Sequence, residues 1–391
     1  PAGSYEPQRI TFASGDRVTF DRVLIGEVWF AGGQSNMEMP LGGFWQCPVT
    51  DANEIIARAD AKSGKLHYVK IPHAAAYTPQ DRTAGSWTPC TTATAAKFTA
   101  AGYFFAEMLN DVLGVPVGII DCSWGGSRVE SWMSREVLSG YSDIDLTEEG
   151  ISRVAQHLRP MVMYNAMLRP VAGYTVRGFL WYQGESNVGR YMDYAARLAD
   201  MVSLWRGLWG RDDLPFYYVE IAPFEYGNGK SPYLREAQCR AQELIPNSGM
   251  ICTNDLVEHY EFCNVHPKNK RDVGYRLAFM ALNKTYGMKE IACQSPQYES
   301  MEIRDGKARI RFKYMDQGFN RMADIRGFEI CGADKVFYPA DAVVENQFAL
   351  VVSSEKVPEP VAVRYCFHDF QPGNLADTRE LPVVPFRTDD F

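Results

Sequence analysis

The chain of 391 residues lacks any apolar run long enough to cross a bilayer, and it has more acidic than basic residues. A membrane-spanning helix needs about 20 consecutive apolar residues, so we expect no membrane span. The formal net charge is −8. A negatively charged surface repels the phosphate backbone, so we expect no nucleic-acid partner. Apolar residues make up 46% of the chain and charged residues 23%, which is typical of a globular protein with a large core.

Paired cysteine motifs, low-complexity segments and internal repeats are also missing. The nine cysteines are scattered and none belongs to a CxxC pair, so we expect neither a structural zinc site nor a thioredoxin-like site. The sequence alone does not decide whether one or two disulfides form among these cysteines. The sequence holds few histidines, at positions His67, His73, His157, His259, His266 and His368. Any reaction that needs a histidine base therefore has a short list of candidates.

Strand and helix patterns alternate between about residues 29 and 286. Short apolar runs typical of buried strands occupy residues 28–31, 117–121, 178–182, 216–221 and 250–253. Helical patterns occupy residues 97–113, 191–209, 232–244 and 267–286. Such alternation predicts an α/β fold in which helices cover both faces of a parallel sheet, a three-layer α/β/α arrangement.

From about residue 290 the pattern changes to period two, as in residues 308–314, 348–353 and 361–367. This is typical of an antiparallel β module. Residues 9–20 alternate as well, around a Gly15-Asp16 turn signal. We therefore predict three units: residues 1–28 as an N-terminal β segment packing with the C-terminal β module, residues 29–290 as a catalytic domain, and residues 291–391 as a β-sandwich-like module.

The most informative segment is residues 28–37, where an apolar strand runs into two glycines and then into Gln34, Ser35 and Asn36. Glycine allows a sharp strand-to-helix turn that lifts Ser35 clear of the sheet. The helix that follows would direct its free N–H groups at whatever Ser35 attacks. Ser35 is thus a candidate nucleophile, provided that a base lies nearby.

The base is best supplied by His266, which follows the last strand and precedes a helix started by proline. Ligands bind beyond the carboxyl ends of parallel strands, so this loop and Ser35 should meet at one edge of the sheet. His259, in the same loop, is the second choice. A triad would add Asp255 as the carboxylate that orients the histidine, whereas a backbone carbonyl there would leave a Ser–His dyad. Both arrangements stay open.

An oxyanion hole needs hydrogen-bond donors aimed at the developing negative charge. We expect three donors: the backbone N–H of Ser35, the N–H of Gly126 after the second strand, and the side-chain amide of Gln183 after the third. Each feature alone is common, but their joint position at three strand ends favours a single site.

Several blocks of the chain, taken together, resemble the sialate O-acetylesterase family of the SGNH-hydrolase superfamily, a group of carbohydrate esterases. They are residues 33–40, 124–132, 181–187, 266–277 and 381–388. The resemblance implies a flavodoxin-like hydrolase domain with attached β modules, and hydrolysis of sugar acetyl esters without metal or organic cofactor. It departs at Cys263, where the superfamily has an aspartate three residues before its histidine.

The resemblance also implies the class of substrate. We expect a small-molecule or glycan acetyl ester, most of all 9-O-acetyl sialic acid. Candidate substrate-binding residues are Arg128, Tyr164, Asn165 and Glu185, of which Glu185 could instead brace its loop. Alternatives are an acetylxylan or other polysaccharide acetylesterase, or a carbohydrate-binding protein without activity.

We expect a secreted or periplasmic protein. The sequence opens at Pro1 with no signal-peptide pattern, and it leaves the oligomeric state undecided.

Overall fold

The computed structural model describes residues 2–321 and 323–391, and its centre is a seven-stranded sheet in the order β5-β4-β6-β3-β7-β8-β9. Neighbouring strands are parallel except for the pair β4 and β5. The strands are β3 (Glu27–Gly33), β4 (Leu66–Lys70), β5 (Thr88–Pro89), β6 (Val117–Ser123), β7 (Gly178–Tyr182), β8 (Phe216–Val219) and β9 (Ser248–Ile251). The order β6-β3-β7-β8-β9 is the 2-1-3-4-5 order of flavodoxin-like sheets. The predicted fold class is confirmed.

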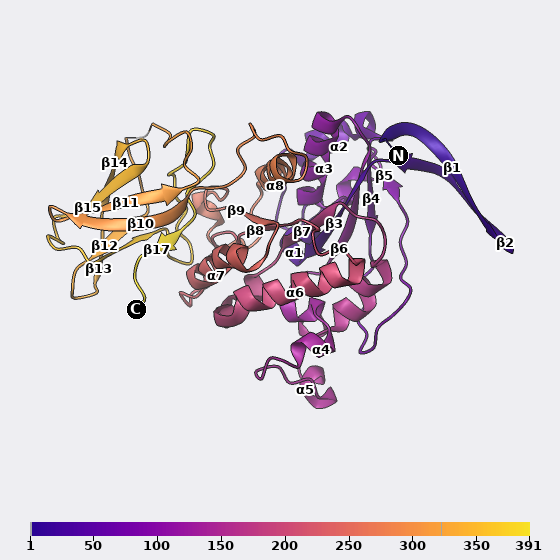
Figure 1. Cartoon of the computed structure of the whole chain (residues 1–391), viewed down its shortest axis with the longest axis horizontal. Helices are drawn as coiled ribbons and strands as arrows, with labels where there is room; N and C mark the ends of the chain where they lie inside the picture. Colours follow the sequence, from indigo (N-terminus) through magenta and orange to yellow (C-terminus); the bar gives the residue numbers. More distant parts are fainter. Residues whose placement is uncertain (1, 322) are drawn as a thin grey trace.

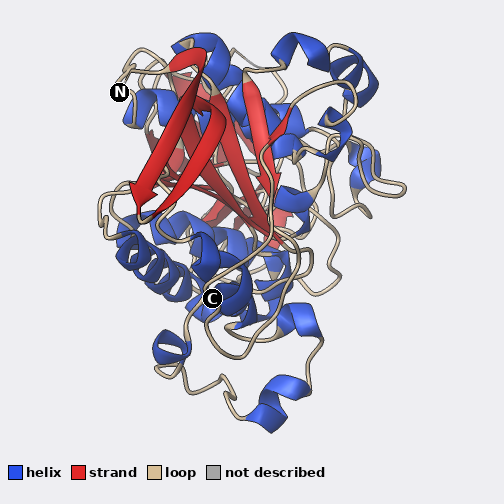
Figure 2. Ribbon diagram, turned by 90° about the vertical axis from the view of Figure 1, so that its right-hand side faces the viewer, coloured by secondary structure: helices blue, strands red, loops and turns tan. Residues whose placement is uncertain are grey.

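Helices cover both faces of this sheet, as Figures 1 and 2 show. The long helices are α3 (Ala100–Leu113), α6 (Tyr194–Trp209), α7 (Ser231–Leu244) and α8 (Lys270–Lys284). Short helices are α1 (Ser35–Glu38), α2 (Ala52–Ala57), α4 (Arg135–Leu138) and α5 (Glu148–Ser152). Alternate residues of β8 enter different cores: Phe216 and Tyr218 pack with α6 and α7, whereas Tyr217 and Val219 pack with α3 and α8. Burial on both faces explains why these strands read as continuous apolar runs.

The C-terminal strands form two four-stranded antiparallel sheets, β10-β11-β15-β14 and β13-β12-β16-β17. Their bounds are β10 (Gln297–Arg304), β11 (Lys307–Lys313), β12 (Phe328–Cys331), β13 (Phe337–Pro339), β14 (Asp341–Asn346), β15 (Ala349–Ser353), β16 (Ala362–Tyr365) and β17 (Phe386–Arg387). Apolar residues from both sheets, among them Ile310 and Ile330, share one buried core. Two sheets around one core make a β-sandwich.

The N-terminal segment forms a hairpin of β1 (Ser4–Ser14) and β2 (Asp16–Ile25), and within the described part of the chain these strands pair only with each other. Figure 1 shows the hairpin, in indigo, at the opposite end of the molecule from the C-terminal sheets, in orange and yellow. The predicted packing of residues 1–28 with the C-terminal module is therefore wrong. Alternation specifies a strand but not its partner, and here the β1–β2 turn supplies the partner locally. The domain boundaries themselves stay a prediction.

Two further observations concern expectations from composition. All nine cysteines are free thiols, so no disulfide links the described residues. No helix in the described part of the chain is long and apolar enough to span a bilayer.

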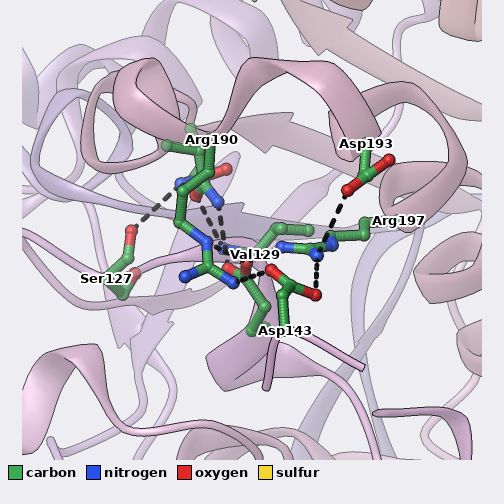
Figure 3. Close-up of polar contacts among 9 residues, drawn as sticks. Ser127, Val129, Asp143, Arg190, Asp193 and Arg197 are labelled. Atoms are coloured by element: carbon green, nitrogen blue, oxygen red, sulfur yellow. Dashed lines mark hydrogen bonds and ion pairs between the residues drawn. The ribbon is translucent and has the colours of Figure 1, made fainter. Parts of the chain in front are cut away.

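A partly buried ion-pair network holds together the loops that follow β6 and β7 (Figure 3). Glu130, on a short 3-10 helix after β6, accepts from Arg197 Nη1 of α6 at 2.5 Å and from Arg190 Nε at 3.1 Å. The same two arginines bind Asp143, each at 2.5 Å. Asn187, after β7, donates to Glu130 Oε2 at 2.9 Å and accepts from the Val129 N–H at 3.1 Å. The two loops are therefore fixed to each other and to α6.

Arg197 is the member of this network whose loss should cost most stability, because its side chain is only 1% exposed. Arg197→Met would leave the buried Glu130 carboxylate with less positive charge beside it. We expect the free energy of unfolding to fall by about 3 kcal/mol in urea titrations. The exposed Arg211, paired with Asp213, is the matched control, and Arg211→Met should cause no measurable change. Equal midpoints for the two variants would contradict this role of the network.

Candidate active site

Ser35 is the first residue of α1, directly beyond the carboxyl end of the central strand β3. The turn requires glycine at Gly33, where φ is +141° and a Cβ atom would lie 2.2 Å from the Tyr182 carbonyl oxygen of β7. The Gln34 N–H donates to that same oxygen at 2.9 Å, which closes the turn against β7. Ser35 is partly exposed, and its backbone N–H, at the start of the helix, has no acceptor among the described residues.

Asn36 joins the serine to the histidine loop. Its Nδ2 donates to the Val265 carbonyl oxygen at 2.9 Å, and its Oδ1 accepts from Lys270 Nζ at 2.7 Å. Asn36 and Val265 are the immediate neighbours of Ser35 and His266. The predicted nucleophile and the predicted base therefore lie on two backbone segments that are hydrogen-bonded beside them.

His266 is largely buried, and burial together with the charge of Lys270 lowers its pKa to about 4. Its Nε2 is buried and has no hydrogen-bond partner among the described residues, whereas its Nδ1 lies 3.8 Å from Cys47 Sγ. An imidazole with this pKa is neutral at neutral pH and able to accept a proton. The second choice, His259, instead faces the Phe370 ring of the C-terminal module, with ring centroids 6.2 Å apart.

Asp255 does not orient His266. Both of its carboxylate oxygens bind the guanidinium of Arg276 on α8, at 2.7 and 2.6 Å. This two-pronged pairing is the geometry that arginine and carboxylate prefer, and it occupies both oxygens of Asp255. The predicted triad through Asp255 is thus wrong, and no carboxylate of the described residues is hydrogen-bonded to His266.

The glycines after β6 border the serine on its other side. A Cβ atom built on Gly125 would lie 3.3 Å from Ser35 Cβ, so this turn touches the serine. Gly126 has φ of +76°, its carbonyl oxygen accepts from Ser186 Oγ at 2.8 Å, and its N–H has no acceptor among the described residues. Two unpaired N–H groups, of Ser35 and Gly126, thus belong to adjoining turns, as an oxyanion hole requires.

Gln183 departs from the predicted oxyanion role. Its side chain is fully buried, and its Nε2 donates to the Ser127 carbonyl oxygen at 3.0 Å and to Asn187 Oδ1 at 2.8 Å. Since an amide nitrogen carries two hydrogens, both are already used. Gln183 therefore fixes the loops after β6 and β7 instead of donating to a substrate.

The sequence interpretation missed Glu38, which supports the glycine turn. Glu38 Oε2 accepts from the Gly125 N–H at 2.7 Å, and its Oε1 pairs with His73 Nε2 at 2.8 Å. The ring of His73 stacks on Trp124, with centroids 4.5 Å apart and planes 1° apart. Burial alone would raise the pKa of Glu38, but the bond from His73 and the charge of Lys70 lower it below its usual value. A signal was present in the sequence, since Glu38 follows Ser35 by three residues, about one helical turn.

The four candidate substrate-binding residues fall into two kinds. Tyr164 and Asn165 are buried, and Asn165 Nδ2 donates to the Ala76 carbonyl oxygen at 3.1 Å, so it holds a neighbouring loop. Glu185 accepts from Asn36 Nδ2 at 2.5 Å and braces the serine turn. Arg128 differs from these three. It is partly buried beside the glycine turn, it belongs to no ion pair among residues 2–321 and 323–391, and burial lowers its pKa.

Two further ring side chains, those of His157 and Trp45, were not among these four candidate residues. A Cβ atom on Gly126 would lie 2.9 Å from His157 Cδ2, so that imidazole borders the glycine turn. Trp45, two residues before Cys47, is 84% exposed. Nothing in the sequence pattern around His157 points to the site, whereas Trp45 stands close to the serine motif.

Comparison with known proteins places these features in a family. A family model described as carbohydrate esterase, sialic acid-specific acetylesterase, matches residues 25–283. Sialate O-acetylesterases of Mus musculus and Pongo abelii are 26% and 27% identical to this chain, each over 88% of it and over 73% and 70% of their own lengths. The crystal structure of a carbohydrate acetylesterase from Xanthomonas citri is 34% identical and superposes with a TM-score of 0.89, covering all of this chain and 87% of that one. The family predicted from the sequence motifs is confirmed: this chain belongs to the sialic acid-specific acetylesterase family of carbohydrate esterases and is a carboxylic ester hydrolase.

Proposed function

We propose that the chain is a serine esterase that removes O-acetyl groups from sugars, with sialic acid as the acetylated sugar. The observation that carries the proposal is the 2.9 Å hydrogen bond between Asn36 Nδ2 and the Val265 carbonyl oxygen, which draws Ser35 and His266 together. The unpaired N–H groups of Ser35 and Gly126 also support the proposal, because they are free to bind an oxyanion next to Ser35. An acetyl-ester substrate needs no more than a nucleophile, a base and an oxyanion hole.

In the proposed reaction, His266 Nε2 removes the proton of Ser35 Oγ as that oxygen attacks the acetyl carbonyl carbon. The Ser35 and Gly126 N–H groups donate to the oxyanion that forms. The bond from the acetyl carbon to the sugar oxygen then breaks, His266 gives its proton to that oxygen, and the sugar leaves as an alcohol with Ser35 acetylated. Water, deprotonated by the same imidazole, attacks the acetyl carbon; the bond from that carbon to Ser35 Oγ breaks, acetate leaves, and the imidazolium returns the proton to Ser35 Oγ.

Ser35→Ala removes the nucleophile without enlarging any buried side chain. We expect acetate release to fall by at least about a thousandfold while the melting temperature stays unchanged. Release can be followed with p-nitrophenyl acetate and by acetate assay on an acetylated sugar. Ser203→Ala, at an exposed position of helix α6, is the matched control and should keep the activity. Full turnover by Ser35→Ala would exclude the proposed mechanism.

The pH dependence should reflect the low pKa of His266. A base must be unprotonated to act, so kcat/KM rises with pH as the imidazole loses its proton. Because burial lowers the pKa of His266 to about 4, the acid limb should lie near pH 4. An unperturbed histidine would place it near pH 6.5. The measurement is kcat/KM on a neutral acetyl ester between pH 3 and 8. An acid limb at pH 6 or above would contradict the assignment.

Arg128 supports sialic acid as the sugar, because that sugar carries a carboxylate and Arg128 is a guanidinium without an ion-pair partner beside the site. A second candidate, an acetylated neutral polysaccharide such as acetylxylan, is favoured by the exposed ring of Trp45, since indole faces bind sugar rings by stacking and apolar contact. The 34% identical relative is described only as a carbohydrate acetylesterase, which suits either sugar. A secreted or periplasmic location follows as a proposal from either glycan.

Two variants separate these substrates. If the substrate is acetylated sialic acid, Arg128→Met should lower kcat/KM for it by about tenfold or more, which is the loss of one charge-assisted hydrogen bond, and should leave p-nitrophenyl acetate turnover unchanged. If it is acetylxylan, Trp45→Ala should raise the KM for that polymer and Arg128→Met should have no effect. Loss of p-nitrophenyl acetate turnover in Arg128→Met would show a structural role for Arg128 and exclude a role specific to the sugar carboxylate.

A further inference from the structure

We propose that the thiol of Cys47 takes the place of the missing carboxylate, as the group that accepts the Nδ1–H of His266 and holds the imidazole in its catalytic orientation. This inference rests on the proposed function, in which His266 is the base. It makes Cys47 a positioning residue, because the thiol acts on the reaction only through the histidine.

The contacts of the Cys47 thiol define the direction in which its S–H bond points. Cys47 Sγ lies 3.8 Å from His266 Nδ1, within hydrogen-bond range for sulfur, and 3.4 Å from Asn264 Oδ1. Asn264 Oδ1 is an acceptor only, and it also receives the His266 backbone N–H at 3.0 Å. The S–H of Cys47 is therefore donated to Asn264, which leaves sulfur lone pairs facing Nδ1.

This direction settles which nitrogen of His266 carries the proton. Because the sulfur can only accept at that contact, Nδ1 must be the N–H nitrogen, and Nε2 keeps its lone pair. Nε2 is buried and has no partner among the described residues, so nothing else competes for the tautomer. The unprotonated Nε2 is the atom that the proposed mechanism needs as its base.

The backbone around Cys47 holds the thiol in place. Cys47 and Phe44 exchange two backbone hydrogen bonds of 3.0 Å, which close a tight turn. The Phe44 ring stands edge-on to His266, with centroids 5.3 Å apart and planes at 71°. One turn therefore contacts the imidazole twice, through an aromatic ring and through a sulfur.

The thiol is a weaker partner than a carboxylate. Burial raises the pKa of Cys47, and the nearby charge of Lys270 only partly opposes this, so the group is neutral at neutral pH. A neutral acceptor orients the imidazole but adds little stabilisation to the imidazolium. It is consistent with a base whose pKa is low, near 4, because no negative charge raises it.

The test compares Cys47→Ala, Cys47→Ser and Cys47→Asp with Cys263→Ala, an exposed cysteine three residues before His266 that serves as the matched control. On p-nitrophenyl acetate we expect Cys47→Ala to lower kcat about tenfold with KM unchanged, and Cys47→Ser to keep most of the rate, since a hydroxyl can also accept and donate. Cys47→Asp should move the acid limb of kcat/KM to higher pH, because a carboxylate raises the pKa of the histidine. Cys263→Ala should match the wild type.

A chemical test uses the folded wild-type protein. Methyl methanethiosulfonate converts a cysteine S–H into a methyl disulfide, with methanesulfinic acid as the leaving group, so the thiol loses its proton and gains bulk beside the imidazole. We expect it to inactivate the wild type and Cys263→Ala, to spare Cys47→Ser, and to be reversed by dithiothreitol.

Wild-type kcat and an unmoved pH profile in both Cys47→Ala and Cys47→Asp would overturn the inference, as would full activity after Cys47 has been methylthiolated. If Cys47→Ala fails to fold, the methylthiolation and the pH profile of Cys47→Asp decide. The outcome is separate from the proposed function, because activity kept by Ser35→Ala or His266→Ala would exclude that function whatever Cys47 does.

Discussion

The side-chain amide of Asn36 is the interaction on which the proposed site depends. It accepts from Lys270, and it donates to Glu185 and to the backbone of the histidine loop, so one side chain joins the serine turn to the loops after β7 and β9. The side chains of Asn36 and Lys270 are fully buried. A buried polar group left without its partner costs about 1–3 kcal/mol, which makes any other arrangement of the three loops unfavourable.

Burial also sets the charges of Glu185 and Lys270, the two ionisable partners of Asn36. Burial raises the pKa of Glu185 and lowers that of Lys270 to about 7, so both groups are driven towards their neutral forms, and Asn36 lies between them. The positive charge that Lys270 keeps helps to hold His266 neutral. Lys270 therefore acts on the base through its charge, and it also fixes the backbone beside His266 through the bond from its Nζ to the Pro267 carbonyl oxygen.

The C-terminal β-sandwich supports the histidine loop from outside. Phe370 packs against His259 and Phe262 of that loop, and Asp369 accepts hydrogen bonds from the backbone N–H groups of Asn228, Gly229 and Ser231 at the start of α7. The loop from β9 to α8 thus lies between the hydrolase sheet and the β module. In Figure 1 the two parts meet at α7 and α8, which agrees with these contacts. Among residues 2–321 and 323–391, the N-terminal hairpin, at the far end of the molecule in Figure 1, has no such hydrogen bond or ring contact with the histidine loop.

The sequence by itself determined the α/β class, the β-rich C-terminal module and the family. It also predicted that Ser35, Gly126 and His266 lie at the same edge of the sheet. These depend on local chemistry: residues 28–31 are apolar because both faces of their strand are buried, and Gly33 is glycine because no Cβ fits against Tyr182. Only the tertiary structure decided which atom each polar side chain binds. Asp255 binds Arg276, and Gln183 donates both amide hydrogens to the loops after β6 and β7. The imidazole of His266 contacts the thiol of Cys47, which is 219 residues away in the sequence. Hydrogen bonds are short-ranged and saturable, so the partner of a side chain depends on what the whole fold brings within about 3–4 Å of it, which no local pattern specifies.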